Sequence, residues 1–247
     1  MQGLAYLLTS FGSSSPLKFW FFAALTAIFA GLGRAVRGVT TGGAIAGSAV
    51  CFALLWGAGT GGFFLLLTVF VLTWISTRLG RAHKIRLGTA EARAGRDALQ
   101  VLANLAAAAT YALVFAFAWP DQRLLLAMAA ALAEAAADTV SSEIGQAFGG
   151  NPHLVTNWGK VAAGTNGAIT LAGTLAGVAS GLTVALVGVV TGLFAWRALP
   201  VCVVAGVMGM IADSFLGATL ERRGLLGNNG VNFISTVVAA VIALNLQ

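Results

Sequence analysis

The sequence predicts an all-α, polytopic membrane helix bundle. Of the 247 residues, 58% are hydrophobic and 9% are charged, and the mean hydropathy is +0.89. Soluble domains usually carry about 25% charged residues. A helix needs roughly 20 apolar residues to cross a hydrocarbon core of about 30 Å, and the chain offers about eight such windows. Since no stretch outside them is long enough to bury its own core, we expect one integral membrane domain over residues 1–247.

The expected helices follow one another at short intervals. They run approximately over residues 17–32, 42–56, 61–76, 98–119, 124–148, 167–196, 200–220 and 231–246. The second window is short and glycine-rich, so seven helices is the alternative count. Gly173, Gly177 and Gly181, four residues apart, predict that the sixth helix packs closely against a neighbour. The first 16 residues lack the basic region of a signal peptide, and we expect a short interfacial helix there.

Basic residues predict the topology, because short cytoplasmic loops carry an excess of Lys and Arg. The loop at about 78–97 is the most basic segment. If it is cytoplasmic, alternation over eight helices leaves only Lys18, Arg123 and Arg197, of 14 Lys and Arg, on the other side. We therefore expect both termini outside and the polar loops at about 78–97, 149–166 and 221–230 on the cytoplasmic face of the cell membrane. The net charge of +6 then reflects topology rather than nucleic-acid binding.

Carboxylates interrupt two apolar segments. Asp138 and Glu143 lie in AALAEAAADTVSSEIGQAFGG, and Asp213 lies in VMGMIADSFLGATL. A charged group in a bilayer costs several kcal/mol, so a chain with only 8 Asp and Glu is expected to use these. On a helix Glu134, Asp138 and Ser142 share one face, whereas Glu143 points about 140° away from Asp138. Oxygen-rich sites with few carboxylates suit Mg²⁺. We predict Asp138, Glu143 and Asp213 as metal ligands, with a structural role in helix packing as the alternative.

Three polar segments predict anion binding at the same face. In TRLGRAHKIRLGTAEARAGRD, Arg and Lys side chains supply the usual phosphate contacts, although a solvated loop has the same composition. In GGNPHLVTNWGKVAAGTNG, Lys160, Thr165 and Asn166 precede a helix whose N-terminus would favour phosphate. This segment lacks the residue order of a Walker A loop, and ordinary helix capping is its alternative. In LERRGLLGNNGVNF, Asn228 and Asn229 offer neutral amides or form a turn.

Taken together and in this order, these motifs resemble the membrane family that contains transmembrane protein 19 and the chloroplast phytyl-phosphate kinase. The matching pieces are LGRAHKIRLGTAEARAGR followed by QVLAN, then DTVSSEIG, the GTNG turn, DSFLGATLERR and NNGVNFIS. The resemblance extends from about Thr40 to the C-terminus. The chain departs from the family pattern at Ala94-Gly95-Arg96, where members often carry Gly-Gly-Arg, and at Asn104-Leu105, where they often carry Asn-Gly.

The resemblance implies a kinase that transfers a phosphoryl group from a nucleoside triphosphate, CTP or ATP, to a polyprenyl, phytyl-like monophosphate. It implies Mg²⁺ as cofactor, the nucleotide as co-substrate, and a lipid bilayer, a polyprenyl phosphate and no nucleic acid as partners, with a homodimer left open. Asp138, Asp213 and Lys160 would be catalytic. The residues that would bind the nucleotide and its phosphates are Arg86, Glu91, Arg93, Arg96, Thr165, Asn166, Asn228 and Asn229.

Two other functions fit the same residues. An ion-coupled secondary transporter could use Asp138 and Asp213 as a proton or cation relay, although this accounts less well for polar motifs gathered on one side. A CTP-dependent cytidylyltransferase acting on a lipid phosphate would also combine CTP, Mg²⁺ and a membrane anion. The products separate the two enzymes, since the cytidylyltransferase releases pyrophosphate and forms a CDP-lipid.

Overall fold

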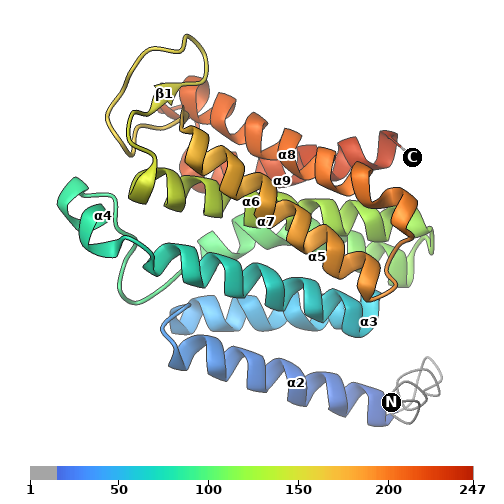
Figure 1. Cartoon of the computed structure of the whole chain (residues 1–247). Coiled ribbons are helices and arrows are strands. Elements are labelled where there is room, and N and C mark those ends of the chain that lie inside the picture. Colours follow the sequence, from blue (N-terminus) through green and yellow to red (C-terminus); the bar gives the residue numbers. More distant parts are fainter. Residues whose placement is uncertain (1–15, 247) are drawn as a thin grey trace.

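The computed structural model describes residues 16–246, and the expected interfacial helix at the N-terminus lies outside them. The elements, drawn in Figure 1, are α2 (Pro16–Ala35), α3 (Thr41–Arg78), α4 (Arg81–Leu87), α5 (Ala98–Phe117), α6 (Gln122–Phe148), β1 (His153–Leu154), β2 (Ala168–Ile169), α7 (Leu171–Val190), the 3₁₀ helix η1 (Trp196–Ala198), α8 (Leu199–Leu216), the π-helical turn η2 (Gly217–Glu221) and α9 (Asn228–Asn245). Seven helices in this part of the chain are long and apolar enough to cross a membrane, which confirms the predicted fold class.

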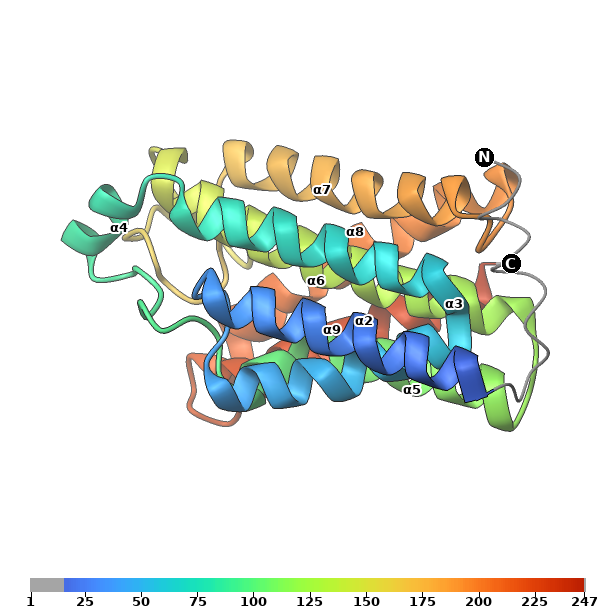
Figure 2. The ribbon, with the colours of Figure 1, turned by 90° about the horizontal axis from the view of Figure 1, so that it is seen from below.

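Helix α3 explains why the sequence allowed either seven or eight helices. Its 38 residues would extend about 57 Å as one straight helix, far more than the hydrocarbon core. Gly59, with φ 62° and ψ −154°, interrupts the helix, and the chain reverses there into two antiparallel arms (Figure 2). The contacts of α2 agree, because Phe19 packs on Phe52 in the first arm and Phe29 packs on Phe63 in the second. Seven helices therefore cross the bundle eight times.

The reversal depends on the backbone of Gly59, and this allows a test. Its conformation is one that only glycine adopts readily, whereas a Cβ at this position would meet no atom within 4 Å. We expect Gly59→Ala to lower the free energy of unfolding by about 1–3 kcal/mol through backbone strain alone. Gly31→Ala, in α2 and equally free of neighbours, is the matched control and should be neutral or slightly stabilising. Thermal unfolding in detergent measures both, and equal midpoints would contradict the assignment of strain.

Helix α6 forms the centre of the bundle. It packs against α3, α5, α7, α8 and α9, and its segment from Leu125 to Ala137 is buried throughout. Its many alanines allow neighbouring backbones to approach closely. A Cβ on Gly173 would lie 2.5 Å from the carbonyl oxygen of Ser141, and one on Gly177 would lie 2.8 Å from that of Ala137. This confirms the predicted packing role of the α7 glycines. Side chains on the inner part of α6 are therefore held in the middle of the protein.

The polar connections gather at one end of the bundle. Figure 1 shows α4, the loop after it and the β1–β2 hairpin at the end opposite to the start of α2 and the end of α9. The two short strands pair antiparallel, with His153 opposite Ile169. Helix α7 begins later than the expected residue 167 because Thr170 caps it, accepting a hydrogen bond of 3.0 Å from the amide of Gly173. We keep the cytoplasmic orientation of this end as a prediction.

Candidate functional site

Two carboxylates from different helices meet at the polar end of the bundle. Asp138 on α6 and Asp213 on α8 line the same cavity and interact electrostatically with each other. The hydroxyl of Ser235, on α9, donates to Oδ2 of Asp213 over 3.3 Å. Glu134 lies one turn before Asp138, is 1% exposed, and interacts electrostatically with both aspartates. Its Oε1 has no hydrogen-bond partner among the described residues. This is a cluster of like charges that favours a cation.

Asp138 and Asp213 line a polar cavity of about 200 Å³, which we call the carboxylate cavity. Its other walls come from α6, through Ser141 and Ser142, and from α8 and η2, through Ser214 and the carboxylate of Glu221. They also come from residues 163–170, the loop that leads into α7. This loop approaches η2 so closely that a Cβ on Gly167 would lie 2.4 Å from the amide nitrogen of Ala218. Gly167 also has a φ of 75°, which side chains disfavour. The cavity thus combines carboxylates and hydroxyls with a loop at a helix N-terminus, where anions bind well.

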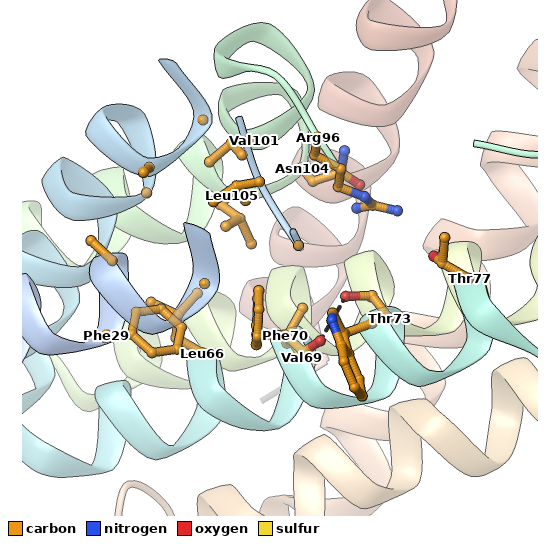
Figure 3. Close-up of a pocket in the computed structure, with 18 of the residues that line it drawn as sticks. Phe29, Leu66, Val69, Phe70, Thr73, Thr77, Arg96, Val101, Asn104 and Leu105 are labelled. Carbon is orange, nitrogen blue, oxygen red and sulfur yellow. Dashed lines mark hydrogen bonds between the residues drawn. The ribbon is translucent and has the colours of Figure 1, made fainter. Parts of the chain in front are cut away.

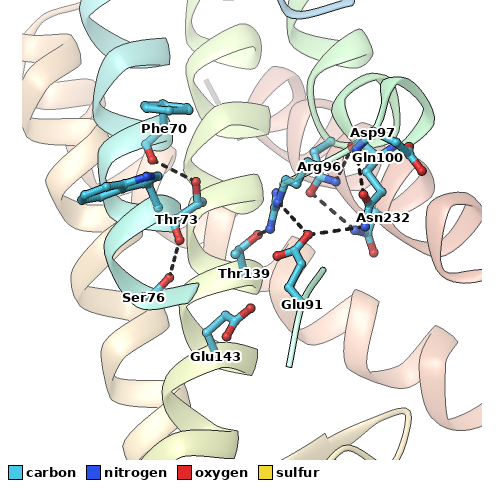
Figure 4. A network of polar contacts seen from close by, with 12 residues as sticks. Phe70, Thr73, Ser76, Glu91, Arg96, Asp97, Gln100, Thr139, Glu143 and Asn232 are labelled. Carbon is cyan, nitrogen blue, oxygen red and sulfur yellow. Dashed lines mark hydrogen bonds and ion pairs between the residues drawn. The ribbon is translucent and has the colours of Figure 1, made fainter. Parts of the chain in front are cut away.

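A second polar cavity, of about 190 Å³, adjoins the first and is called here the arginine cavity. Asp138, Ser142 and Asn228 line both. Its cation is Arg96, whose Nη2 donates to Oγ1 of Thr139 over 3.1 Å and whose Nε lies 3.6 Å from Oε1 of Glu91 (Figure 4). Arg96 is therefore held beside α6, within electrostatic range of Asp138.

Backbone contacts position Arg96. Its amide donates to the carbonyl of Gly38 over 3.0 Å, and its carbonyl accepts from the amide of Thr40 over 2.9 Å. Gly95 has a φ of 84°, and a Cβ there would lie 2.5 Å from the carbonyl carbon of Gly38. The second glycine of the family pattern is therefore the one that this packing requires. After it, Asp97 caps α5 together with Gln100 in a reciprocal capping box.

Comparison with known proteins identifies the family. The family model described as "Integral membrane protein DUF92" matches residues 24–240. The chain belongs to this family. Among similar proteins, an uncharacterized membrane protein of Synechocystis is 35% identical over 78% of this chain and 77% of its own length. An uncharacterized membrane protein of Methanocaldococcus jannaschii is 36% identical over 82% of this chain and 83% of its own length. The chloroplastic protein VTE6 of Arabidopsis thaliana is 32% identical over 86% of this chain and 66% of its own length. No solved structure matches the chain.

In this DUF92 protein, more than half of the predicted site residues line the two polar cavities. They are Asp213, Thr165 and Asn166 in the carboxylate cavity, Glu91, Arg96 and Glu143 in the arginine cavity, and Asp138 and Asn228 in both. Arg86, Lys160 and Asn229 line neither. Arg86 is exposed on α4, where its Nη2 lies 3.3 Å from Nδ1 of His83. Arg93 lies elsewhere, with Arg37, Arg78 and Arg81, around an open hollow of about 320 Å³.

Glu143 lines the arginine cavity with Asp138 but does not line the carboxylate cavity, where Asp138 and Asp213 meet. It forms an ion pair with Lys84 of α4, as expected for a side chain that points away from Asp138 on the same helix. Lys84 is fully buried, and its Nζ also donates to the carbonyl oxygens of Ser76 over 3.1 Å and Thr77 over 2.9 Å, near the C-terminus of α3. The pair joins residues 59 positions apart, so sequence reasoning missed it.

Proposed function

We propose that this DUF92 protein is a membrane-embedded kinase that transfers a phosphoryl group from a nucleoside triphosphate to a polyprenyl monophosphate. One observation carries the proposal. Two carboxylates from different helices, Asp138 and Asp213, adjoin in the wall of a polar cavity, and Arg96 is held beside the first of them in the adjoining cavity. Phosphoryl transfer requires such an arrangement, because it depends on positioning and charge neutralisation more than on covalent work by the protein.

The residues present fit Mg²⁺. Among residues 16–246, no group of three or more histidine, cysteine, aspartate and glutamate side chains could hold a metal ion by itself. Asp138 and Asp213 would therefore supply two carboxylates, and water and substrate phosphates would complete the shell, as is usual for Mg²⁺. Nearby Glu134, with an unpartnered oxygen, adds negative charge that a divalent cation would offset. Under this proposal Glu143 acts with Lys84 and is not a metal ligand.

The two cavities suggest how the substrates are divided. We assign the nucleotide to the carboxylate cavity, where Thr165, Asn166 and the amides at the start of α7 would bind its phosphates. The acceptor phosphate is assigned to the arginine cavity, where Arg96 would hold it beside Asp138. Asn228 lines both and would contact either substrate. The roles of Lys160, Arg86 and Arg93 stay predictions. They are exposed cations on α4 and on loops at the same end, and they would attract incoming anions.

The proposed reaction needs no protein nucleophile. An oxygen of the lipid phosphate attacks the γ-phosphorus, the bond from that phosphorus to the bridging oxygen breaks, and a lipid diphosphate and a nucleoside diphosphate leave. Bound Mg²⁺ would neutralise the nucleotide phosphates. Arg96 would orient the attacking group and stabilise its negative charge. The resemblance to the chloroplast phytyl-phosphate kinase supports a prenyl phosphate as the acceptor.

Product analysis tests the proposal. Purified protein is incubated with Mg²⁺, prenyl monophosphates and CTP or ATP labelled at either the α- or the γ-phosphate. We expect the γ-label in a lipid diphosphate, loss of the product with EDTA, and recovery with added Mg²⁺. Transfer of the α-label to the lipid with release of pyrophosphate would instead indicate a cytidylyltransferase. Solute uptake into proteoliposomes driven by an ion gradient, without nucleotide turnover, would indicate a transporter.

A further inference from the structure

A third cavity lies between α2, α3 and α5 and is mostly apolar. It has a volume of about 90 Å³, and we call it the apolar cavity. Its apolar wall, drawn in Figure 3, is formed mainly by Phe29 of α2, by Leu66, Val69 and Phe70 of the second arm of α3, and by Val101 and Leu105 of α5. None of these side chains has a polar group, so the cavity suits a hydrocarbon chain.

Space for a chain comes from a small residue on the first arm of α3. Gly47 lines the apolar cavity, and a Cβ built there would meet no atom within 4 Å. A glycine inside a helix costs about 1 kcal/mol relative to alanine, and no backbone approach requires one at this position. The empty volume in front of Gly47 is therefore free to receive a ligand.

The other end of the apolar cavity is cationic. Arg37, Arg78 and Arg96 line it. Arg78 is held by a hydrogen bond of 2.6 Å from its Nη2 to the carbonyl of Val36, and its guanidinium lies 4.0 Å from the ring centre of Trp74. Among the described residues neither Arg37 nor Arg78 has an ion-pair partner, and Arg96 has only the long contact to Glu91. This end is therefore complementary to an anion.

The apolar cavity continues into the arginine cavity. Glu91, Arg96 and Asn104 line both, and the arginine cavity extends to Asp138. Apolar walls, arginines and the carboxylates of the site thus follow one another through adjoining cavities. A lipid monophosphate has the same order of chemistry, with an apolar chain at one end and a doubly charged phosphate at the other.

From this arrangement we propose that the apolar cavity holds the phosphate-proximal part of the isoprenoid chain of a lipid monophosphate, with its phosphate on Arg96. The phosphate would replace Glu91 as the main partner of Arg96, which the 3.6 Å separation of that pair allows. The inference rests on the proposed function for the identity of the acceptor. It adds which helices form the lipid site and which cations receive the headgroup.

Filling the cavity tests the inference by activity. Gly47→Leu places a side chain into the apolar cavity, whereas Gly31→Leu makes the same change on an exposed face of α2 that also has no neighbour within 4 Å. We expect Gly47→Leu to raise the KM for a long-chain prenyl monophosphate about tenfold or more, as loss of roughly two buried methylene groups would. The KM for nucleotide should stay unchanged, and Gly31→Leu should change neither KM. An unaltered long-chain KM in Gly47→Leu would overturn the inference while leaving the kinase intact.

A binding experiment keeps the inference independent of turnover. A prenyl monophosphate with a photoreactive diazirine on its first isoprene units is cross-linked to the full chain in detergent. We expect labels on α2, α3 and α5, competition by unlabelled prenyl monophosphate, and reduced labelling in Gly47→Leu only. Labelling that phosphatidate displaces equally well, or labels confined to other helices, would contradict the isoprenoid assignment. Specific labelling without any kinase activity would count against the proposed function alone.

Discussion

Asp138→Asn and Asp213→Asn are each expected to lower kcat by at least about 100-fold, because each removes one of two carboxylates proposed to hold Mg²⁺ at the transferred phosphate. Asparagine keeps the shape of the side chain but binds a divalent cation far more weakly. Since the two groups would act as a unit, the double variant should be little worse than either single one. Initial rates at saturating nucleotide and lipid, with Mg²⁺ varied, measure the effect, and added Mg²⁺ should restore part of it.

Folding must be shown to survive in these variants. Asp138 and Asp213 repel each other and Glu134, so neutralising one of them should leave the thermal midpoint in detergent unchanged or raise it. Asp121→Asn is the matched control. Asp121 lies in the loop between α5 and α6, where hydrogen bonds from Arg123 hold the pKa of its carboxyl below the usual value. Replacing the Asp121 carboxylate should leave kcat unaltered. Full activity in both site variants would contradict the proposal that Asp138 and Asp213 bind Mg²⁺.

Lys84→Met is expected to lower the free energy of unfolding by about 3–5 kcal/mol, because it leaves the Glu143 carboxylate buried without its partner. The ammonium of Lys84 also loses its contacts to the carbonyl groups of Ser76 and Thr77. The double variant Lys84→Met/Glu143→Leu should recover much of this loss, since two apolar groups of similar size can replace a buried ion pair. Chemical denaturation in detergent, followed by tryptophan fluorescence, measures all three proteins.

The exposed pair of Arg123 and Asp121, with an N–O distance of 2.7 Å, supplies the comparison for the Lys84 variants. Arg123→Met should leave the unfolding midpoint unchanged, because solvent screens an exposed ion pair. If Lys84→Met is as stable as the parent, the buried pair does not hold α4 against α6. A double variant no more stable than Lys84→Met would show that the carbonyl contacts, rather than the unpaired charge, account for the loss.

The sequence predicted the bundle because membrane-spanning helices are recognisable as long apolar segments. It left the helix count open at α3, where no charged residue marks the reversal and only Gly59 adopts the required backbone conformation. Two short apolar windows on either side of such a turn are equally consistent with two separate helices and with one interrupted helix. The start of α7 was placed too early because the strand Ala168–Ile169 and the Thr170 cap intervene, and these residues do not interrupt the apolar window.

Within the site, rarity was the useful signal. Asp138 and Asp213 stand out because charged residues seldom lie in apolar helices, and the structure brings both to the wall of one cavity. Glu143 satisfied the same criterion, but its partner depends on how α4 folds back against α6, which no local pattern encodes. The arginines were harder to separate, since Arg86, Arg93 and Arg96 belong to one basic loop. Only the packing of Gly95 on Gly38 directs Arg96 inward.

The antiparallel arms of α3 also bear on how the chain enters a bilayer. Between Thr41 and Arg78 there is no charged side chain, including at the turn around Gly59. Its flanking arginines, Arg37 and Arg78, lie at the same end, beside the same cavities. Insertion as a preformed helical hairpin would therefore carry no ionised group across the hydrocarbon, and its backbone polar groups would already be satisfied within the arms.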